Sequence, residues 1–397
     1  MGKNLLEGIR VIEIGMYVTA PQTTKALSDC GAEVIKIETG GRQAGRGGNP
    51  AAKSPAQRDT GKLSITLNFA SPRGLELARR LIAKTDIIVE NLSQGSLIRH
   101  GMGYEDLKKI KPDIIMLSTC MQGQTGPYRS HSASGHKLSA LSGYNHISGW
   151  PDREPGWVGP YTDYIAPRYN IIAILAALDY RQQTGKGQFL DMAQNEAGVQ
   201  FMAPLILDYA VNQRVANRMG NQHPYAAPHN AYRCIGEDRW CAISVFTDEE
   251  WESLCGVIGN PALAKNPKFS TLLARKENEE ELDRLVNEWT IKHQAEEVMT
   301  LMQSAGVAAG VAETAEDQLD YDPQLKDRHF FWELDFPGMG KYRSPVGANF
   351  LLSKTPYELR RSPSVLGEHN DYVFKELLGL SDEEITELVK ERVIATR

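Results

Sequence analysis

The first 120 residues alternate between short runs of branched apolar residues and segments with helix-start signals, and this alternation strongly constrains the fold. Pro21 and the pair Ser71-Pro72 mark helix starts between the runs. Because alternating strands and helices build parallel sheets, the sequence predicts an α/β fold with a large Rossmann-like domain. The strand candidates are residues 8–15, 32–38, 63–67, 86–91 and 113–118.

The carboxyl ends of these strands are where a parallel sheet gathers its ligands. Asn91, Ser118 and the loop through Arg99 would lie there. Glu38 ends the second strand, as an acidic residue does in dinucleotide-binding folds. However, residues 16–20 lack the glycines that a phosphate-binding GxGxxG loop needs. We therefore predict neither nicotinamide nor flavin binding.

The rest of the chain predicts a second domain inserted into the first. A charged, mainly helical stretch between two strand regions indicates a smaller α+β domain over residues 225–325. The large domain is expected to comprise residues 1–211 and a return segment over 330–397. We also expect one long apolar helix over residues 195–211, kinked at Pro204.

Asp163 stands where a Gly-Pro loop enters a long apolar helix that ends near Gly185. One interpretation is a helix cap, in which Thr162 or Asp163 accepts bonds from the free backbone N–H groups of the first turn. The other is a carboxylate nucleophile that forms a covalent intermediate. This stretch alone leaves both interpretations open.

Composition narrows the classes of function. The formal net charge of −6 gives no sign of nucleic-acid binding. No apolar run reaches the roughly 18 residues of a membrane span, and the amino terminus lacks a signal-peptide core. The five cysteines are scattered and no HExxH motif occurs, so we predict neither disulfides nor a metal site. A cytoplasmic protein is expected.

Residues 39–62 are rich in glycine, arginine and lysine. This composition is typical either of a solvated flexible loop or of a basic loop that lies over a phosphate-bearing ligand.

Five ordered motifs over nearly the whole chain together resemble the family III CoA-transferases, the group that includes formyl-CoA and carnitine CoA-transferases. The opening pair of strands, the strand end Glu90-Asn91, a TGxGQ turn and a PxxxGEH segment carry this resemblance. These motifs are residues 8–13, 31–38, 86–92, 184–188 and 362–369.

The resemblance implies that Asp163 is the catalytic carboxylate and that CoA is the co-substrate. It implies transfer from an acyl-CoA donor to a carboxylic acid acceptor through an aspartyl anhydride and an aspartyl-CoA thioester. Thr39 stands where the family often has a basic residue, so Arg42 is expected to replace it. His136 stands where relatives carry a polar, often acidic, residue. The implied CoA-site positions are Val18, Thr39, Arg42, Leu67, Asn68, Asn91, Arg99 and His136.

The resemblance also implies an assembly of two chains linked like interlocked rings, either a homodimer or a hetero-oligomer with a related subunit. Aromatic residues such as Tyr161 and Tyr164 flank Asp163. If they line the pocket, they favour an aromatic or dicarboxylic acceptor. One interpretation of the chain is then a subunit of a benzylsuccinate-type CoA-transferase. Two rivals remain open. One is an acyl-CoA racemase or isomerase, for which His136 is the candidate partner of Asp163. The other is a non-catalytic subunit that binds CoA.

Overall fold

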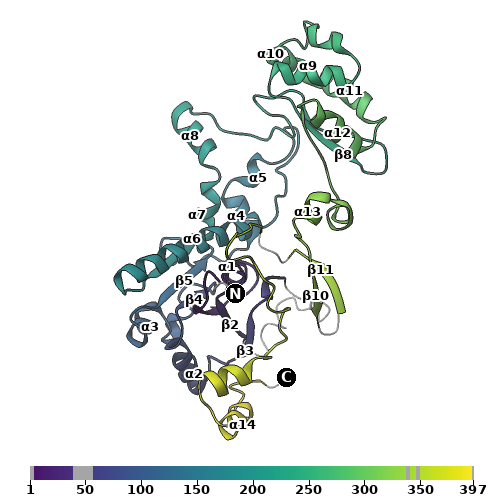
Figure 1. Cartoon of the computed structure of the whole chain (residues 1–397). Coiled ribbons are helices and arrows are strands. Elements are labelled where there is room, and N and C mark those ends of the chain that lie inside the picture. The colour runs from purple at the N-terminus through teal and green to yellow at the C-terminus, as the bar shows by residue number, and fades with distance from the viewer. Residues whose placement is uncertain (1–3, 39–56, 337–339, 346–348, 396–397) are drawn as a thin grey trace. The chain divides into compact units, whose positions relative to one another are not determined.

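The structure is a computed structural model that describes residues 4–38, 57–336, 340–345 and 349–395 (Figure 1). The chain divides into two compact units. The larger unit comprises residues 1–144, 158–214 and 323–397, and the smaller comprises 145–157 and 215–322. Residues 145–157 thus group with the smaller unit, although the predicted boundaries placed them in the larger one.

A six-stranded parallel sheet forms the centre of the larger unit (Figure 1), as predicted. Its strand order is β3-β2-β1-β4-β5-β6, so the direction of strand addition reverses between β1 and β4. Val11 of β1 pairs with Val34 of β2 on one side and with Ile87 of β4 on the other. The strands are β1 (Arg10–Ile14), β2 (Glu33–Glu38), β3 (Leu63–Thr66), β4 (Ile87–Glu90), β5 (Ile115–Cys120) and β6 (Phe189–Ala193).

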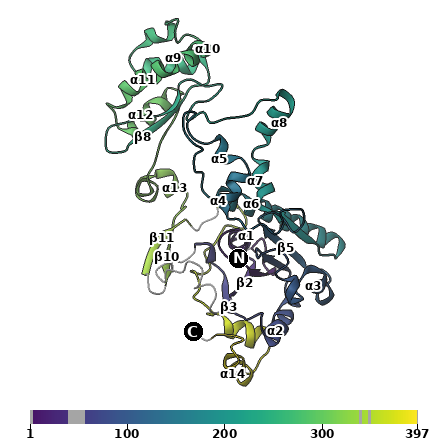
Figure 2. The same ribbon diagram turned by 180° about the vertical axis from the view of Figure 1, so that it is seen from behind.

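Helices cover both faces of this sheet because successive strand residues point to opposite sides. Val11 packs on the face covered by α1 (Thr19–Asp29) and α6 (Tyr161–Thr184). Ile12 packs on the other face, with α2 (Pro72–Ile82), α3 (Tyr104–Ile110) and α14 (Asp382–Lys390). In both views α14 lies beside α2 (Figure 2), and Arg73 of α2 pairs with Glu391 at 2.9 Å.

The carboxy-terminal segment returns to the larger unit and covers the outer edge of β3. The Ser64 carbonyl accepts from the His369 backbone N–H at 2.9 Å, and the Thr66 N–H donates to Asn370 Oδ1 at 2.9 Å. The Asn68 N–H donates to the Val393 carbonyl at 2.8 Å. Loop residues from the far end of the chain therefore satisfy the free edge of the sheet.

The smaller unit has its own core, built from a three-stranded antiparallel sheet and the helices packed on it. Trp251 and Phe269 are among its largest buried side chains. Its elements are β7 (His229–Arg233), β8 (Trp240–Ser244), β9 (Ala308–Val311), α9 (Asp248–Val257), α10 (Leu272–Glu277), α11 (Glu279–Thr290) and α12 (Ala295–Ser304).

The expected long helix over residues 195–211 was wrong. Two helices, α7 (Gln194–Gln200) and α8 (Ala203–Asn212), are separated at Phe201 and Met202. Pro204 lies in the first turn of α8, where its missing N–H leaves no helical bond unmade, so it starts a helix rather than kinks one. The predicted Ser71 cap of α2 is confirmed, because its side chain accepts from the Gly74 N–H.

The remaining elements are short. They are α4 (Gly135–Leu141), α5 (Tyr144–Ile147), α13 (Pro323–Asp327), β10 (Trp332–Phe336), β11 (Gly340–Ser344), η1 (Gln57–Asp59), η2 (Ile98–His100), η3 (Pro261–Lys265), η4 (Asp317–Tyr321) and η5 (Tyr372–Leu377). Among the described residues, no helix combines the length and apolar character needed to cross a membrane.

Candidate active site

Asp163 is the third residue of α6, so the helix-cap interpretation was wrong. The cap position is Pro160, and no side-chain hydrogen bond caps this helix. The start of α6 is instead fixed from another helix, since the Tyr161 N–H donates to Ser139 Oγ of α4 at 3.0 Å. The Asp163 carboxylate is therefore available for contacts outside its own first turn.

The Asp163 carboxylate contacts the first residues of two helices, α7, which follows β6 in the chain, and α4, which follows β5. Gln194, the first residue of α7, donates its side-chain N–H to Asp163 Oδ1. The carboxylate also packs against the Cα of Gly135, at the start of α4. A methyl group built on Gly135 would come within 2.5 Å of the carboxylate carbon and both of its oxygens.

Burial and charge act in opposite directions on Asp163. Partial burial raises the pKa of Asp163, whereas the hydrogen bond from Gln194 and the charges of His136 and Arg58 oppose this rise. The net pKa stays above the ordinary value of an aspartate. A partly desolvated carboxylate that accepts a hydrogen bond from a buried amide is the setting of a nucleophile or of an acid/base group.

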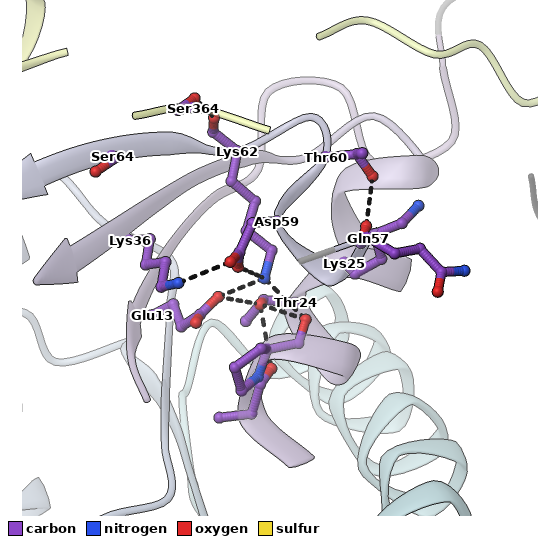
Figure 3. Close-up of polar contacts among 12 residues, drawn as sticks. Glu13, Thr24, Lys25, Lys36, Gln57, Asp59, Thr60, Lys62, Ser64 and Ser364 are labelled. Atoms are coloured by element: carbon purple, nitrogen blue, oxygen red, sulfur yellow. Dashed lines mark hydrogen bonds and ion pairs between the residues drawn. The ribbon is translucent and has the colours of Figure 1, made fainter. Parts of the chain in front are cut away.

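A buried cluster of charges lies at the start of α1 and includes Asp59, the neighbour of Arg58 in the chain (Figure 3). Lys62 Nζ lies 2.7 Å from Glu13 Oε2 and 3.5 Å from Asp59 Oδ1, and it donates to the Pro21 carbonyl at 2.8 Å. Asp59 also pairs with Lys36 at 3.0 Å. The η1 turn that carries Arg58 is thus tied through Asp59 to the sheet and to α1.

The charges within this cluster depend on one another. Although burial acts to raise it, the pKa of Asp59 is lowered by the neighbouring Lys62 and Lys36. The Lys62 side chain is 2% exposed and Glu13 is fully buried, so neither charge is solvated by bulk water.

Asn91 joins the carboxyl ends of β4 and β1, at the reversal in strand order. Its Oδ1 accepts from the Met16 N–H at 2.9 Å, and its Nδ2 donates to the Met16 carbonyl at 2.7 Å and to Thr19 Oγ1 at 3.2 Å. The amide therefore holds the turn in which Val18 precedes α1. Ligands of parallel sheets bind in the crevice at such a reversal.

The other predicted positions lie in different surroundings. His136 is the second residue of α4, next to Gly135, and its electrostatic influence lowers the pKa of Asp163. Leu67 is buried and its N–H donates to the Glu38 carbonyl, while Asn68 bonds the carboxy-terminal segment. Arg99 is exposed and donates to the Gln94 carbonyl at 3.4 Å. Thr39 and Arg42 lie outside the described residues.

The sequence predictions missed Gly135, Gln194 and the position of Arg58. Gln194 directly follows β6, so its place just after a short apolar run that ends in Ala193 was the one available signal. Nothing in the local sequence marks Gly135, because its role is to leave space for a distant side chain.

A pocket of about 310 Å³ opens beside the carboxyl ends of β5 and β6, lined among others by Gln122, Thr125, Tyr128, Asp191 and Glu196. Polar contacts connect its wall to the sheet. The Gln124 N–H donates to Asp191 Oδ1 at 2.9 Å, and the Gln124 side chain reaches Ser118 Oγ, which donates to Glu90.

Glu90 carries a pH-dependent contribution to stability. Burial raises its pKa from 4.5 to about 7, despite bonds from Ser118 and the Leu92 N–H. The folded state thus binds a proton more tightly than the unfolded state. This contribution is fully present below pH 4.5 and is lost as the pH rises through 7.

We expect the effect of Glu90→Gln on the free energy of unfolding to be about 3 kcal/mol more favourable at pH 8 than at pH 4. The reason is that the amide keeps a hydrogen-bond acceptor but carries no buried charge at pH 8. Urea midpoints at both pH values measure this difference. The exposed carboxylate change Glu76→Gln is the control and should show no divergence between the two pH values. Parallel curves for Glu90→Gln and the unmodified protein would contradict the prediction.

Comparison with known proteins decides the family. The chain matches the family described as CoA-transferase family III over residues 6–370. This chain belongs to CoA-transferase family III. It is 33% identical to succinyl-CoA–D-citramalate CoA-transferase from Chloroflexus aurantiacus, over 98% of both chains. It is 31% identical to the beta subunit of succinyl-CoA–L-malate CoA-transferase from the same organism, over 98% of both chains.

A solved structure supports the same assignment. A CaiB/BaiF family protein from Brucella suis superposes with a TM-score of 0.85 and 32% identity, covering 94% of this chain and all of that one. The resemblance inferred from the motifs is therefore confirmed. The protein is a CoA-transferase, and CoA is its co-substrate. In the described part of the chain no cluster of three or more metal-ligating side chains occurs.

Because the carboxylate packs against the Cα of Gly135, we expect Gly135→Ala to displace Asp163 and to lower CoA transfer about 100-fold. Asp163 has a flexible side chain, so the fold should tolerate the methyl group. Steady-state transfer rates and the thermal midpoint measure the two effects. Gly256→Ala is the control, because Gly256 is a helical glycine with open space around it. Unchanged transfer by Gly135→Ala would show that this close approach is not used in catalysis.

Proposed function

We propose that this CoA-transferase moves CoA from succinyl-CoA to a dicarboxylic acid through covalent intermediates on Asp163. The observation that carries the proposal is the Asp163 carboxylate, which is partly desolvated, bonded by Gln194 and packed against the Cα of Gly135. The names of the two Chloroflexus relatives support succinyl-CoA as donor and a hydroxylated dicarboxylic acid as acceptor.

Asp163 acts first as a nucleophile. One of its oxygens attacks the thioester carbonyl of the donor, forming a mixed anhydride as the C–S bond breaks and CoA leaves as thiolate. Asp163 then exchanges its acyl group for CoA, because the thiolate attacks the Asp163 Cγ and releases the donor acid. The acceptor carboxylate attacks the resulting thioester, and the steps run in reverse to acceptor-CoA. No net proton transfer is needed.

The charge of Arg58 favours an acceptor with a second carboxylate. One carboxylate of the acceptor reacts at Asp163, and the Arg58 charge, which acts on Asp163, attracts anions to this region. Arg58 is suited to this role because the buried cluster around Lys62 fixes the turn that carries it. A planar guanidinium also matches the geometry of a carboxylate.

The CoA site is proposed at the carboxyl ends of β1 and β4. Val18 and Asn91 lie there, and the backbone at Leu67 and Asn68 follows β3, which β2 separates from β1 in the same sheet. Arg99 and Arg42 are the cations proposed to meet the nucleotide phosphates, since charge-assisted bonds to phosphate are the strong ones. We also propose an assembly of two chains, and the naming of one relative as a beta subunit makes a related partner chain the alternative to a homodimer.

A screen of acceptors tests the proposed function. The protein is incubated with succinyl-CoA and, separately, with D-citramalate, L-malate, benzylsuccinate or a monocarboxylic acid, and the acyl-CoA products are identified by mass spectrometry. A new acyl-CoA with a dicarboxylic acceptor is expected. Transfer only to monocarboxylic acids would overturn the proposed acceptor class.

The racemase alternative is tested by carrying out the same reactions in deuterium oxide. It is measured because His136 acts electrostatically on Asp163 and is the candidate second member of an acid/base pair. An acid/base pair at the α-carbon would introduce deuterium there without CoA transfer. Such exchange in the absence of any new acyl-CoA would replace the proposed function.

A further inference from the structure

Gln194 contacts one oxygen of Asp163 from a buried position. It is 4% exposed and begins α7 directly after the last residue of β6. Its Nε2 donates to Asp163 Oδ1 and lies 3.4 Å from Thr162 Oγ1. The position of this side chain is thus set by the end of a strand and by the first turn of α6, which are rigid elements of the fold.

This contact makes the two oxygens of Asp163 unequal. Oδ1 accepts the bond from Gln194, so Oδ2 is the oxygen left to attack the donor. Once Oδ2 is bonded to the donor acyl carbon, Oδ1 becomes the carbonyl oxygen of the aspartyl acyl group. Gln194 then faces the atom on which negative charge develops when Cγ is attacked.

We propose that Gln194 is a catalytic residue that stabilises the oxyanion on Asp163 Oδ1 each time Cγ is attacked. The inference rests on the proposed covalent route through Asp163. In the step concerned, the thiolate sulfur bonds to Cγ and an electron pair moves onto Oδ1. That pair then re-forms the carbonyl as the bond from Cγ to the donor carboxylate breaks, and the donor acid leaves with its electrons.

A neutral hydrogen-bond donor suits both the attack by the Asp163 carboxylate on the donor and the later attacks on Asp163 Cγ. A lysine or arginine in contact with Oδ1 would strongly favour the charged carboxylate and weaken it as a nucleophile. The Gln194 amide lowers the pKa of Asp163 less than burial raises it. A buried donor that points at developing charge needs no solvent rearrangement, and removing one such donor costs about 100- to 1000-fold in rate.

The test separates the first step from the later ones. Gln194→Leu should leave acylation of Asp163 by succinyl-CoA within several-fold of the unmodified rate, because Oδ2 carries out that attack. Conversion to the CoA thioester and overall transfer should fall by about 100-fold or more. Rapid quenching and mass spectrometry of the peptide containing Asp163 should then show the succinyl adduct accumulating. Gln200→Leu, an exposed change on the same helix, is the matched control.

A second variant keeps the test independent of folding. Gln194→Glu preserves shape, but it donates only when protonated, so its transfer rate should rise as the pH is lowered. A residue that only packs would not produce this profile. Transfer by Gln194→Leu within threefold of the control, an equal loss of acylation and transfer, or a flat pH profile for Gln194→Glu would each overturn the role. A missing Asp163 adduct in the unmodified protein would instead refute the proposed function.

Discussion

Asp163→Asn protein is expected to fold normally and to retain less than about 1% of CoA transfer, because removing a covalent nucleophile commonly costs several orders of magnitude in rate. The amide keeps the shape of the side chain but is not an ionised nucleophile. Since no side chain caps α6, this substitution removes no helix cap. Product formation from succinyl-CoA and the thermal midpoint measure the two expectations.

Trapping identifies the residue directly. Hydroxylamine added after succinyl-CoA should convert Asp163 to a hydroxamate and inactivate the enzyme, whereas hydroxylamine alone should leave it active, because a free carboxylate is not electrophilic. A hydroxamate at another residue, or transfer by Asp163→Asn above a few per cent, would refute the assignment of the nucleophile.

Lys62→Met should destabilise the protein by about 3–5 kcal/mol, because it leaves the fully buried Glu13 charge without its partner. The urea midpoint should fall by roughly 1 M. Lys341→Met is the matched control: Lys341 pairs with Glu333 at the same 2.7 Å, but both side chains are largely exposed, so its removal should change little.

A double-mutant cycle assigns the loss to the pair. Glu13→Gln combined with Lys62→Met removes both charges, so it should recover much of the stability lost in Lys62→Met alone. Equal midpoints for the single and double variants would mean that the lost contacts of Lys62 with Pro21 and Asp59, rather than the stranded Glu13, account for the effect.

The elements best predicted from the sequence are those with a strong local pattern. The branched apolar runs predict the strands β1 to β5, and Ser71 predicts the cap of α2. The break between α7 and α8 has no such pattern, since apolar residues continue through Phe201 and Met202.

The surroundings of Asp163 depend on contacts between distant segments, which is why local reasoning missed them. Gln194 contacts Asp163 because β6 ends beside the start of α6, and Gly135 because α4 starts there. The cap interpretation failed for the same reason, since Ser139 of another helix bonds the start of α6. The motifs single out Asp163 as the proposed nucleophile, whereas only the fold shows which residues lie beside it.

The covering of β3 by the carboxy-terminal segment has a consequence for synthesis of the chain on the ribosome. Thr66 and its partner Asn370 are 304 residues apart, so about 15 to 60 seconds of translation separate them at common elongation rates. During that time the nascent sheet carries an open edge, the kind of surface that recruits strands from other chains. Emergence of residues 369–393, rather than emergence of the sheet itself, is therefore the moment at which the edge of β3 becomes protected from aggregation.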